Sequence, residues 1–270
     1  FGTAPDVKKL IEICKTNNLY VIEDFSQGLN ASSGSKKLGS FGDASIYSSS
    51  AIKQIDTFGG GHCVSDNADL ISKIRIEQMN LNPSKRMFLI KKILTNLIYN
   101  FATNQIIFNL VVYPLLRILK NLGSDVNKMT GSRDKRPIKE LPSEWFGSFT
   151  SYQALIGIST LKNVQSFDAK RIHHAHKVMK IASTMKFGQR KNKHDHTYWQ
   201  LVTYANNPSA VIEMLRANGV DSCTSSLELL SGLSDYPGSQ AMPNALKIHT
   251  RAIFIPCFAR LSGHQKQKIY

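Results

Sequence analysis

The apolar residues of the first 80 positions follow two periods, which predict helices and strands in alternation. In residues 5–17, PDVKKLIEICKTN, apolar side chains recur at helical spacing, and Pro5 lies near the first turn, where its missing N–H costs nothing. One face of this helix would carry Val7, Leu10, Ile11 and Cys14.

Short apolar runs after this helix predict strands at 19–22, 44–48 and 62–65. Helical spacing then returns over 68–79, where Asp66 and Asn67 are the candidate N-caps. Helices that alternate with short strands indicate an α/β protein, in which the loops at the strand ends carry the chemistry.

Residues 87–122 form an apolar helical segment of a different kind. From 93 to 116, 24 positions in a row carry no charge, but Asn96, Asn100 and Asn104 draw a polar stripe along one side. Basic residues flank both ends, so the charge asymmetry of a spanning helix is missing. Three alternatives stay open: helices packed on the protein body or a subunit interface, a segment lying on a membrane surface, and a true span.

The C-terminal half predicts a separate α+β unit after a polar, basic linker at 127–142. Helical periodicity covers 150–186, and a strand (198–205), a helix (209–220) and a second strand (251–257) follow. We therefore divide the chain into residues 1–82, 83–142 and 143–270, with the apolar segment and the linker in the middle part.

Composition limits the class of protein. The chain has 270 residues, of which 42% are hydrophobic and 20% charged, as in a folded globular protein, and it does not open with a signal peptide. The net charge of +15 indicates an anionic partner, but no nucleic-acid-binding motif accompanies it, so we expect no nucleic acid. The four scattered cysteines lack metal-ligand spacing and favour reduced thiols in the cytoplasm without a bound metal.

Candidate chemistry gathers at the strand ends of the first 65 residues. In LYVIEDFSQG, residues 19–28, an apolar run is followed by Glu23 and Asp24. Carboxylates at the end of a buried strand are costly unless a cation lies next to them. A hydroxyl run, YSSSAIK, leads to Lys53, and the glycine turn FGGGH follows. A lysine after a serine-rich strand end, near a carboxylate from a neighbouring strand, is what a pyridoxal phosphate (PLP) site requires.

The order of these features resembles the DegT/DnrJ/StrS-type sugar aminotransferases, PLP enzymes of the fold-type I (aspartate aminotransferase-like) superfamily. FGTAPDVKKLIEICKTNNLYVIEDFSQ and KKLGSFGDASIYSSSAIKQIDTFGGGHCVSD carry the likeness most closely, over residues 1–80. SYQALIGISTLKN, DAKRIHHAHKVM and IFIPCFARLSGHQKQKI continue it more loosely. The resemblance implies the C-terminal part of the family's large α/β domain, an apolar helical insertion and an α+β small domain, with the N-terminal part of the large domain missing.

The resemblance also implies roles for individual residues. Asp24 would pair with the pyridinium nitrogen of PLP, and Gln27 would lie beside the ring near its phenolic oxygen. Ser48 would hold the phosphate, and Lys53 would be the Schiff-base lysine and proton shuttle. Glu23 would point to the other side of the strand and serve the structure.

In such enzymes an amino donor, usually glutamate, passes its amine through the cofactor to a keto-sugar on a nucleotide carrier. The resemblance therefore implies a homodimeric cytoplasmic aminotransferase of polysaccharide or glycan biosynthesis. Its nucleotide-sugar substrate would be anionic, which agrees with the positive net charge of the chain. Two other functions are weighed beside it. One is an inactive or regulatory PLP-fold protein, and the other is a module that acts at the inner face of a membrane through residues 87–122.

One segment departs from the family pattern, and the histidines lie outside that pattern. EWFGSFTSYQ has Phe146 and Ser148 where an amide and a guanidinium that reach into the neighbouring subunit are expected. The histidines at 173, 174, 176, 194 and 196 lie among basic residues, which favours a solvated surface.

Overall fold

A computed structural model describes residues 1–84, 86–122, 140–184, 196–224 and 242–259, together with residues 227, 229, 261 and 269. In the N-terminal part, the elements are α1 (Val7–Thr16), β1 (Ile22–Asp24), β2 (Ser32–Ser33), β3 (Lys36–Lys37), β4 (Ala44–Ser48), β5 (Gly61–Val64) and α2 (Ala68–Asn80). The middle part contains β6 (Asn82–Pro83), α3 (Arg86–Ala102), α4 (Gln105–Ile107), a π-helical turn (Phe108–Val112) and α5 (Tyr113–Asn121). The C-terminal part contains a 3₁₀ turn (Ser143–Trp145), β7 (Gly147–Ser148), α7 (Ser151–Leu161), α8 (Val164–Thr184), β8 (Leu201–Tyr204), α9 (Pro208–Ala217), α10 (Pro243–Arg251) and β9 (Ala252–Ile255).

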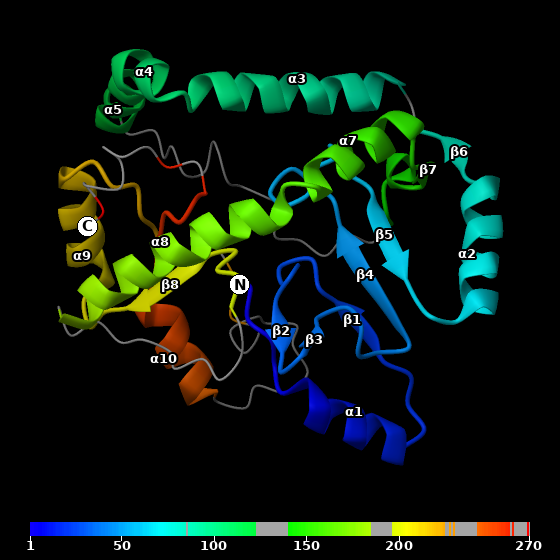
Figure 1. The fold of residues 1–270 in the computed structure, drawn as a ribbon. Helices are drawn as coiled ribbons and strands as arrows, with labels where there is room; N and C mark the ends of the chain where they lie inside the picture. Colours follow the sequence, from blue (N-terminus) through cyan, green and yellow to red (C-terminus); the bar gives the residue numbers. More distant parts are fainter. Residues whose placement is uncertain are drawn as a thin grey trace.

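The N-terminal sheet has the strand order β1-β4-β5 (Figure 1). β1 runs parallel to β4 and β5 runs antiparallel to it. The helices and strands predicted for this part are confirmed, except for the first strand, which the apolar run predicts as a buried strand at 19–22. The observed strand begins at Ile22, which is 67% exposed, because β1 lies at the edge of the sheet and pairs with β4 only from Ile22 to Asp24.

The two carboxylates of β1 have different environments. Glu23 accepts three backbone N–H bonds from the loop before β4: Gly39 N at 2.9 Å on Oε2, and Phe41 N at 2.5 Å and Gly42 N at 2.7 Å on Oε1. A carboxylate that accepts several backbone N–H groups orders the loop that provides them. These contacts give Glu23 the structural role expected from the sequence.

The C-terminal part is built on β8 and β9, the two strands that the sequence predicts, which pair in antiparallel fashion. α8 and α9 both contact this pair, and Figure 1 shows α8 crossing beside β8. Side chains from α8, β8 and the segment after β9 form one core cluster, whose buried members are Ala175, Val178, Tyr198, Leu201 and Cys257.

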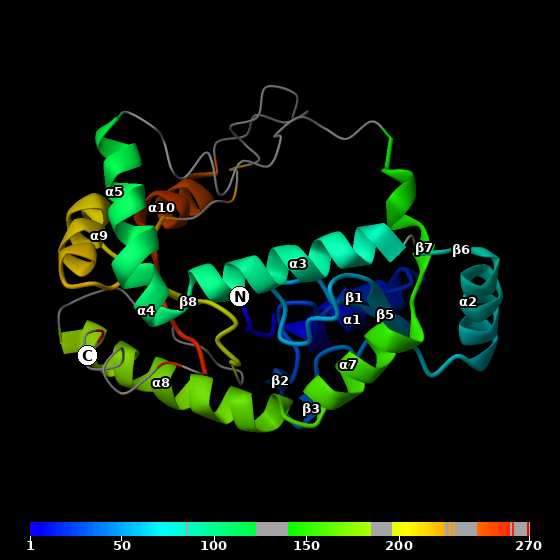
Figure 2. The same ribbon diagram turned by 90° about the horizontal axis from the view of Figure 1, so that it is seen from above.

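The helices of the middle part lie along one side of the molecule. Figure 2 shows α3 running from the β6–β7 pair toward α4 and α5. Within the described ranges, no helix combines the length and the apolarity needed to cross a bilayer.

The histidines of α8 are not all on the surface. His174 is 1% exposed, so the prediction of a solvated surface is wrong for this residue, while His173 and His176 are exposed. The reason is helical spacing, because His174 lies on the side of α8 that also carries Ala175 and Val178 into the core. His196 stacks on Tyr198 at a centroid distance of 4.0 Å, and residue 194 lies outside the described residues.

Cys257 is expected to make the stability of the folded state sensitive to alkaline pH. Burial raises the pKa of its thiol to about 12, from an ordinary value of 9.0. The folded thiol keeps its proton where the unfolded thiol loses it, so its contribution to stability is complete below about pH 9 and is lost as the pH rises toward 12. The free energy of unfolding should therefore fall by up to ~1.4 kcal/mol per pH unit above pH 9 through this thiol.

Urea unfolding of the chain and of Cys257→Ala, measured at a series of pH values, checks this effect. The substitution should flatten the alkaline slope, although it also lowers stability at every pH by leaving a small cavity. Burial also raises the pKa of Tyr47 and Tyr198, so part of the slope remains in both proteins. Parallel slopes for the two proteins would contradict the assignment to Cys257.

Candidate active site

The parallel pairing of β1 and β4 brings two of the predicted site residues to the same end of the sheet. Asp24 is the last residue of β1 and pairs with Ile46, two residues before Ser48 at the end of β4. Both side chains lie where the carboxyl ends of parallel strands meet, the usual place for ligand binding in an open α/β sheet. Asp24 is exposed and Ser48 is half-buried.

The segments after the two strands are joined by Ser26. Its backbone N–H donates to Asp24 Oδ1 at 2.9 Å, and its hydroxyl oxygen accepts the backbone N–H of Ser48 at 2.8 Å. Among the described residues Asp24 Oδ2 has no hydrogen-bond partner, so this oxygen can accept a hydrogen bond from a ligand. The Ser48 hydroxyl is 3.4 Å from that of Ser50, which places two hydroxyl groups together beyond β4.

Lys53 lies in an ordered turn after β4. Its backbone N–H donates to Ser50 O at 2.9 Å, and Tyr47 Oη accepts the backbone N–H of Ile55 at 2.9 Å. The Lys53 ammonium lies 4.8 Å from the centre of the Trp199 ring. No carboxylate of the described residues pairs with it, so the amine is not held in an ion pair and is available for reaction.

Gln27 lies three residues after the end of β1 and is exposed. The Phe1 ammonium donates to Gln27 Oε1 at 3.0 Å. Its pKa is lowered first by burial and then by the positive charge of Lys53. Gln27 is thus bonded to the amino group of Phe1, whose pKa the charge of Lys53 lowers.

This donor set fits PLP. The accessible Asp24 carboxylate suits a protonated ring nitrogen, the paired hydroxyls of Ser48 and Ser50 suit phosphate oxygens, and Lys53 is an amine free of acidic partners. The four predicted residues come from one strand end, the segment after it and the turn after the neighbouring strand. The individual role of each in binding the cofactor stays a prediction.

A glycine turn closes the far side of the Lys53 loop. Gly60 has φ +85°, and a Cβ at this position would lie 2.6 Å from Phe149 Cδ2, so only glycine fits. The buried Gln153 side chain donates to Thr57 O at 3.1 Å and Gly59 O at 3.2 Å. The N-terminus of α7, where Gln153 also completes a capping box, thus holds the end of the turn.

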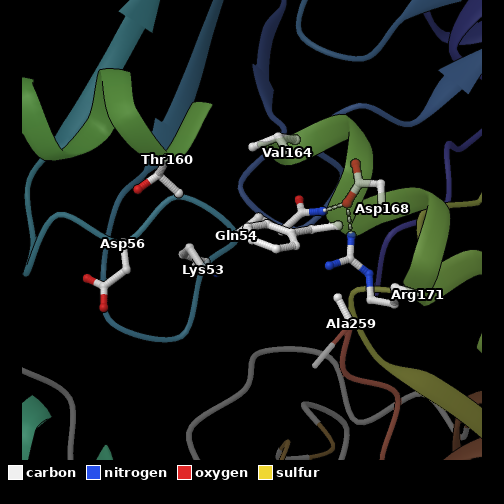
Figure 3. A pocket seen from close by; sticks show the side chains of 9 residues that line it. Lys53, Gln54, Asp56, Thr160, Val164, Asp168, Arg171 and Ala259 are labelled. Atoms are coloured by element: carbon white, nitrogen blue, oxygen red, sulfur yellow. Dashed lines mark hydrogen bonds and ion pairs between the residues drawn. The ribbon is translucent and has the colours of Figure 1, made fainter. Parts of the chain in front are cut away.

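The sequence reasoning missed a buried acidic residue that supports the same loop. Asp168 of α8 is 2% exposed and accepts the amide of Gln54 at 2.9 Å on Oδ1 and that of Asn30 at 2.9 Å on Oδ2. Its third partner is the guanidinium of Arg171, and Figure 3 shows Gln54 and Arg171 pointing toward it. Arg171 also donates through Nε to Thr197 O at 2.7 Å.

Trp199 is the second support from the C-terminal part. Its indole N–H donates to Ile52 O at 3.0 Å while its ring faces the Lys53 ammonium. Ile52, Lys53 and Gln54 are therefore each held by a side chain from the C-terminal part. A pocket of about 350 Å³ opens beside them, between Lys53, Asp168 and Arg171 (Figure 3). The Asp168–Arg171 spacing of three residues could have predicted an ion pair on a helix, but nothing local predicts its contact with Gln54.

The positions that depart from the family pattern lie next to β6. Ser148 belongs to β7 and pairs in parallel with Pro83, and its carbonyl accepts the hydroxyl of Ser84 at 2.8 Å. Phe146 is exposed.

Comparison with solved structures shows the fold. The chain matches a DegT DnrJ EryC1 StrS aminotransferase from Brucella abortus with a TM-score of 0.67 at 16% identity, over 100% of this chain and 60% of that one. It matches Helicobacter pylori PseC, an aminotransferase of pseudaminic acid biosynthesis, with a TM-score of 0.65 at 18% identity, over 99% and 62%. The chain thus has the α/β fold of the PLP-dependent fold-type I sugar aminotransferases, of which it represents a part.

The sequence comparison then gives the family. Residues 1–110 match the model of the DegT/DnrJ/EryC1/StrS aminotransferase family. The chain is 31% identical to the UDP-4-amino-4,6-dideoxy-N-acetyl-beta-L-altrosamine transaminase of Campylobacter jejuni over 121 residues. These residues are 45% of this chain and 32% of the relative. The chain is 33% identical over 87 residues to the GDP-perosamine synthase of Vibrio cholerae, 32% of this chain and 24% of the relative.

The resemblance inferred from the sequence is therefore confirmed. The matched segment spans about a third of the Campylobacter relative, and the chain spans about three fifths of the solved structures. The family match ends at residue 110, inside the part predicted as an insertion. The division of the chain at residues 82 and 142 remains a prediction.

Proposed function

We propose that this protein is a PLP-dependent aminotransferase that moves an amino group from an amino acid, glutamate by our expectation, to a nucleotide-linked keto-sugar. The observation that carries the proposal is the placement of Asp24 and Ser48 at one end of two parallel strands, with Lys53 in the ordered turn that follows. Relatives named as UDP-sugar and GDP-sugar aminotransferases support the substrate class.

PLP, when bound, supplies an electron sink for cleavage of a bond next to the substrate nitrogen. Asp24 would keep the ring nitrogen protonated, because its free carboxylate oxygen accepts that proton in a hydrogen bond. Ser48 would hold the phosphate, and Gln27 would orient the ring from the side. The Lys53 amine would bind the cofactor covalently and, once the substrate amine has displaced it, would move the proton of the substrate carbon that carries the nitrogen.

The partners follow from charge and from the family. A net charge of +15 raises the local concentration of an anionic nucleotide-sugar. We infer that the protein works as a homodimer, since the family resemblance implies a site completed by a neighbouring subunit. A cytoplasmic location agrees with four free cysteines in the structure.

The test is a half-reaction followed by absorbance. The assay uses the longest natural protein that contains this sequence, because the solved relatives are longer than this chain. After loading with PLP, the protein should be yellow, lose this absorbance on addition of glutamate, and regain it with a keto-sugar nucleotide. Colour that persists with every amino donor would favour the inactive or regulatory alternative and refute the proposed activity.

A further inference from the structure

The middle helix α3 is oriented with its polar side toward the protein. Asn96 donates through Nδ2 to Asp56 Oδ2 at 2.8 Å, and Asn100 donates to Asn96 at 2.8 Å. Lys92 is half-buried on the same side, close to Gly59. Asp56 and Gly59 belong to the loop that carries Lys53, so the polar stripe fixes α3 against the site loop.

The opposite side of α3 is apolar and exposed. Steps of 100° per residue place its members together, about half a turn away from Asn96. Ile98 is 66% exposed and Phe101 67% exposed, and Figure 1 shows this helix at the border of the molecule. We name this side the outer α3 face, and its apolar residues are Met87, Ile90, Leu94, Ile98 and Phe101.

This arrangement is the reverse of an ordinary surface helix, which buries its apolar side and exposes its polar side. The apolar character also continues beyond α3, since Ile106, Leu110 and Ile118 are exposed in the helices that follow. A contiguous apolar surface of this kind marks an interaction site.

The charge of the segment indicates what binds there. Residues 78–124 contain no Asp or Glu and six Lys or Arg, at 85, 86, 91, 92, 117 and 120. Lys91 is exposed at the margin of the outer α3 face. Two copies of such a segment would repel each other, whereas an apolar face with a basic margin matches an anionic lipid surface.

We propose that the outer α3 face binds the surface of a bilayer that contains anionic lipids. α3, about 25 Å long at 17 residues, would lie parallel to the membrane with its apolar side chains among the acyl chains. Lys91 and neighbouring basic residues would contact lipid phosphates. The contact between Asn96 and Asp56 would then hold the Lys53 loop close to the membrane surface. The lipid contact does not depend on the proposed enzymatic activity.

Vesicle co-sedimentation of the full chain tests the proposal. The chain should bind vesicles of phosphatidylcholine with phosphatidylserine, and bind vesicles of phosphatidylcholine alone at least about tenfold more weakly. The double substitution Leu94→Glu, Ile98→Glu places two carboxylates in the outer α3 face and should reduce binding at least about tenfold.

A matched control carries the same chemical change elsewhere. Ile76→Glu, Met79→Glu alters two exposed apolar residues of α2 and changes the net charge equally. This variant should bind anionic vesicles within about twofold of the unaltered chain. Because all four side chains are exposed, both variants should keep the circular dichroism spectrum and the thermal midpoint of the parent.

Three results would overturn the proposal. The first is an unaltered chain that stays in the supernatant with anionic vesicles. The second is equal loss of binding in the α2 control, which would mean that net charge alone drives sedimentation. The third is a dimer that dissociates in the Leu94→Glu, Ile98→Glu variant while vesicle binding is retained, which would assign the face to a second copy of the chain.

Discussion

Substituting alanine for Lys53 is expected to lower amino transfer by at least about 10³-fold. The substitution removes the amine that would bind the cofactor and carry the substrate proton. No carboxylate of the described residues forms an ion pair with this amine, so the loss of an ion pair would not explain the lower rate. The rate of absorbance change after addition of glutamate, with PLP in excess, measures the loss.

The control for this variant is Lys9→Ala, which removes the same side chain from the exposed side of α1. It should leave the rate unchanged within about twofold. Thermal midpoints of the two variants should also be similar, since among the described residues the Lys53 side chain contributes a cation–π contact to Trp199 and no ion pair. A Lys53→Ala protein that retains a tenth or more of the rate would remove Lys53 from the chemistry.

Substituting alanine for Asp168 is expected to lower the free energy of unfolding by about 3–5 kcal/mol. The change leaves the Arg171 guanidinium, 11% exposed, without its acidic partner, and it removes the acceptor of Asn30 and Gln54. Urea unfolding followed by circular dichroism measures the loss. The exposed Asp66→Ala, for which no side-chain contact is recorded among the described residues, should change stability by less than about 0.5 kcal/mol.

Asp168→Ala should also loosen the Lys53 turn, because Gln54 loses the contact that ties it to α8. The fluorescence of Trp199 reports this, since its indole N–H is bonded to Ile52 O in the same turn. Trp145 is the other tryptophan of the chain, so the comparison is made in a Trp145→Phe background. A loss below about 1 kcal/mol, with an unchanged Trp199 spectrum, would contradict the view that Asp168 holds the turn.

Local patterns predicted the elements well because each depends on neighbouring residues. Helical spacing predicted α1, α2, α7 and α9, and the short apolar runs predicted β4 and β9. The first strand was misplaced because its start depends on the partner strand, which pairs with it only from Ile22. His174 was misjudged because the charges on either side of it in the sequence do not reveal which side of α8 meets the core.

The sequence predicts those parts of the candidate site whose residues are close together in the chain or lie on adjacent strands. Adjacent parallel strands place Asp24 and Ser48 at the same end, and Lys53 follows five residues later. The support from Asp168 and Trp199 was not predictable, because it joins residues 114 and 147 positions apart. The polar stripe of α3 was visible in the sequence, but its direction depends on the contact between Asn96 and Asp56.

Borohydride reduction of the PLP-loaded protein, followed by peptide mass mapping, tests the central claim most directly. Reduction fixes the bond between the cofactor and the amine that holds it, so the modified residue can be identified. We predict a pyridoxyl-phosphate adduct on the peptide that contains Lys53, and its loss in Lys53→Ala but not in Lys9→Ala. An adduct on another lysine, or none on a loaded protein that is yellow before reduction, would contradict the assignment of this turn as the cofactor site.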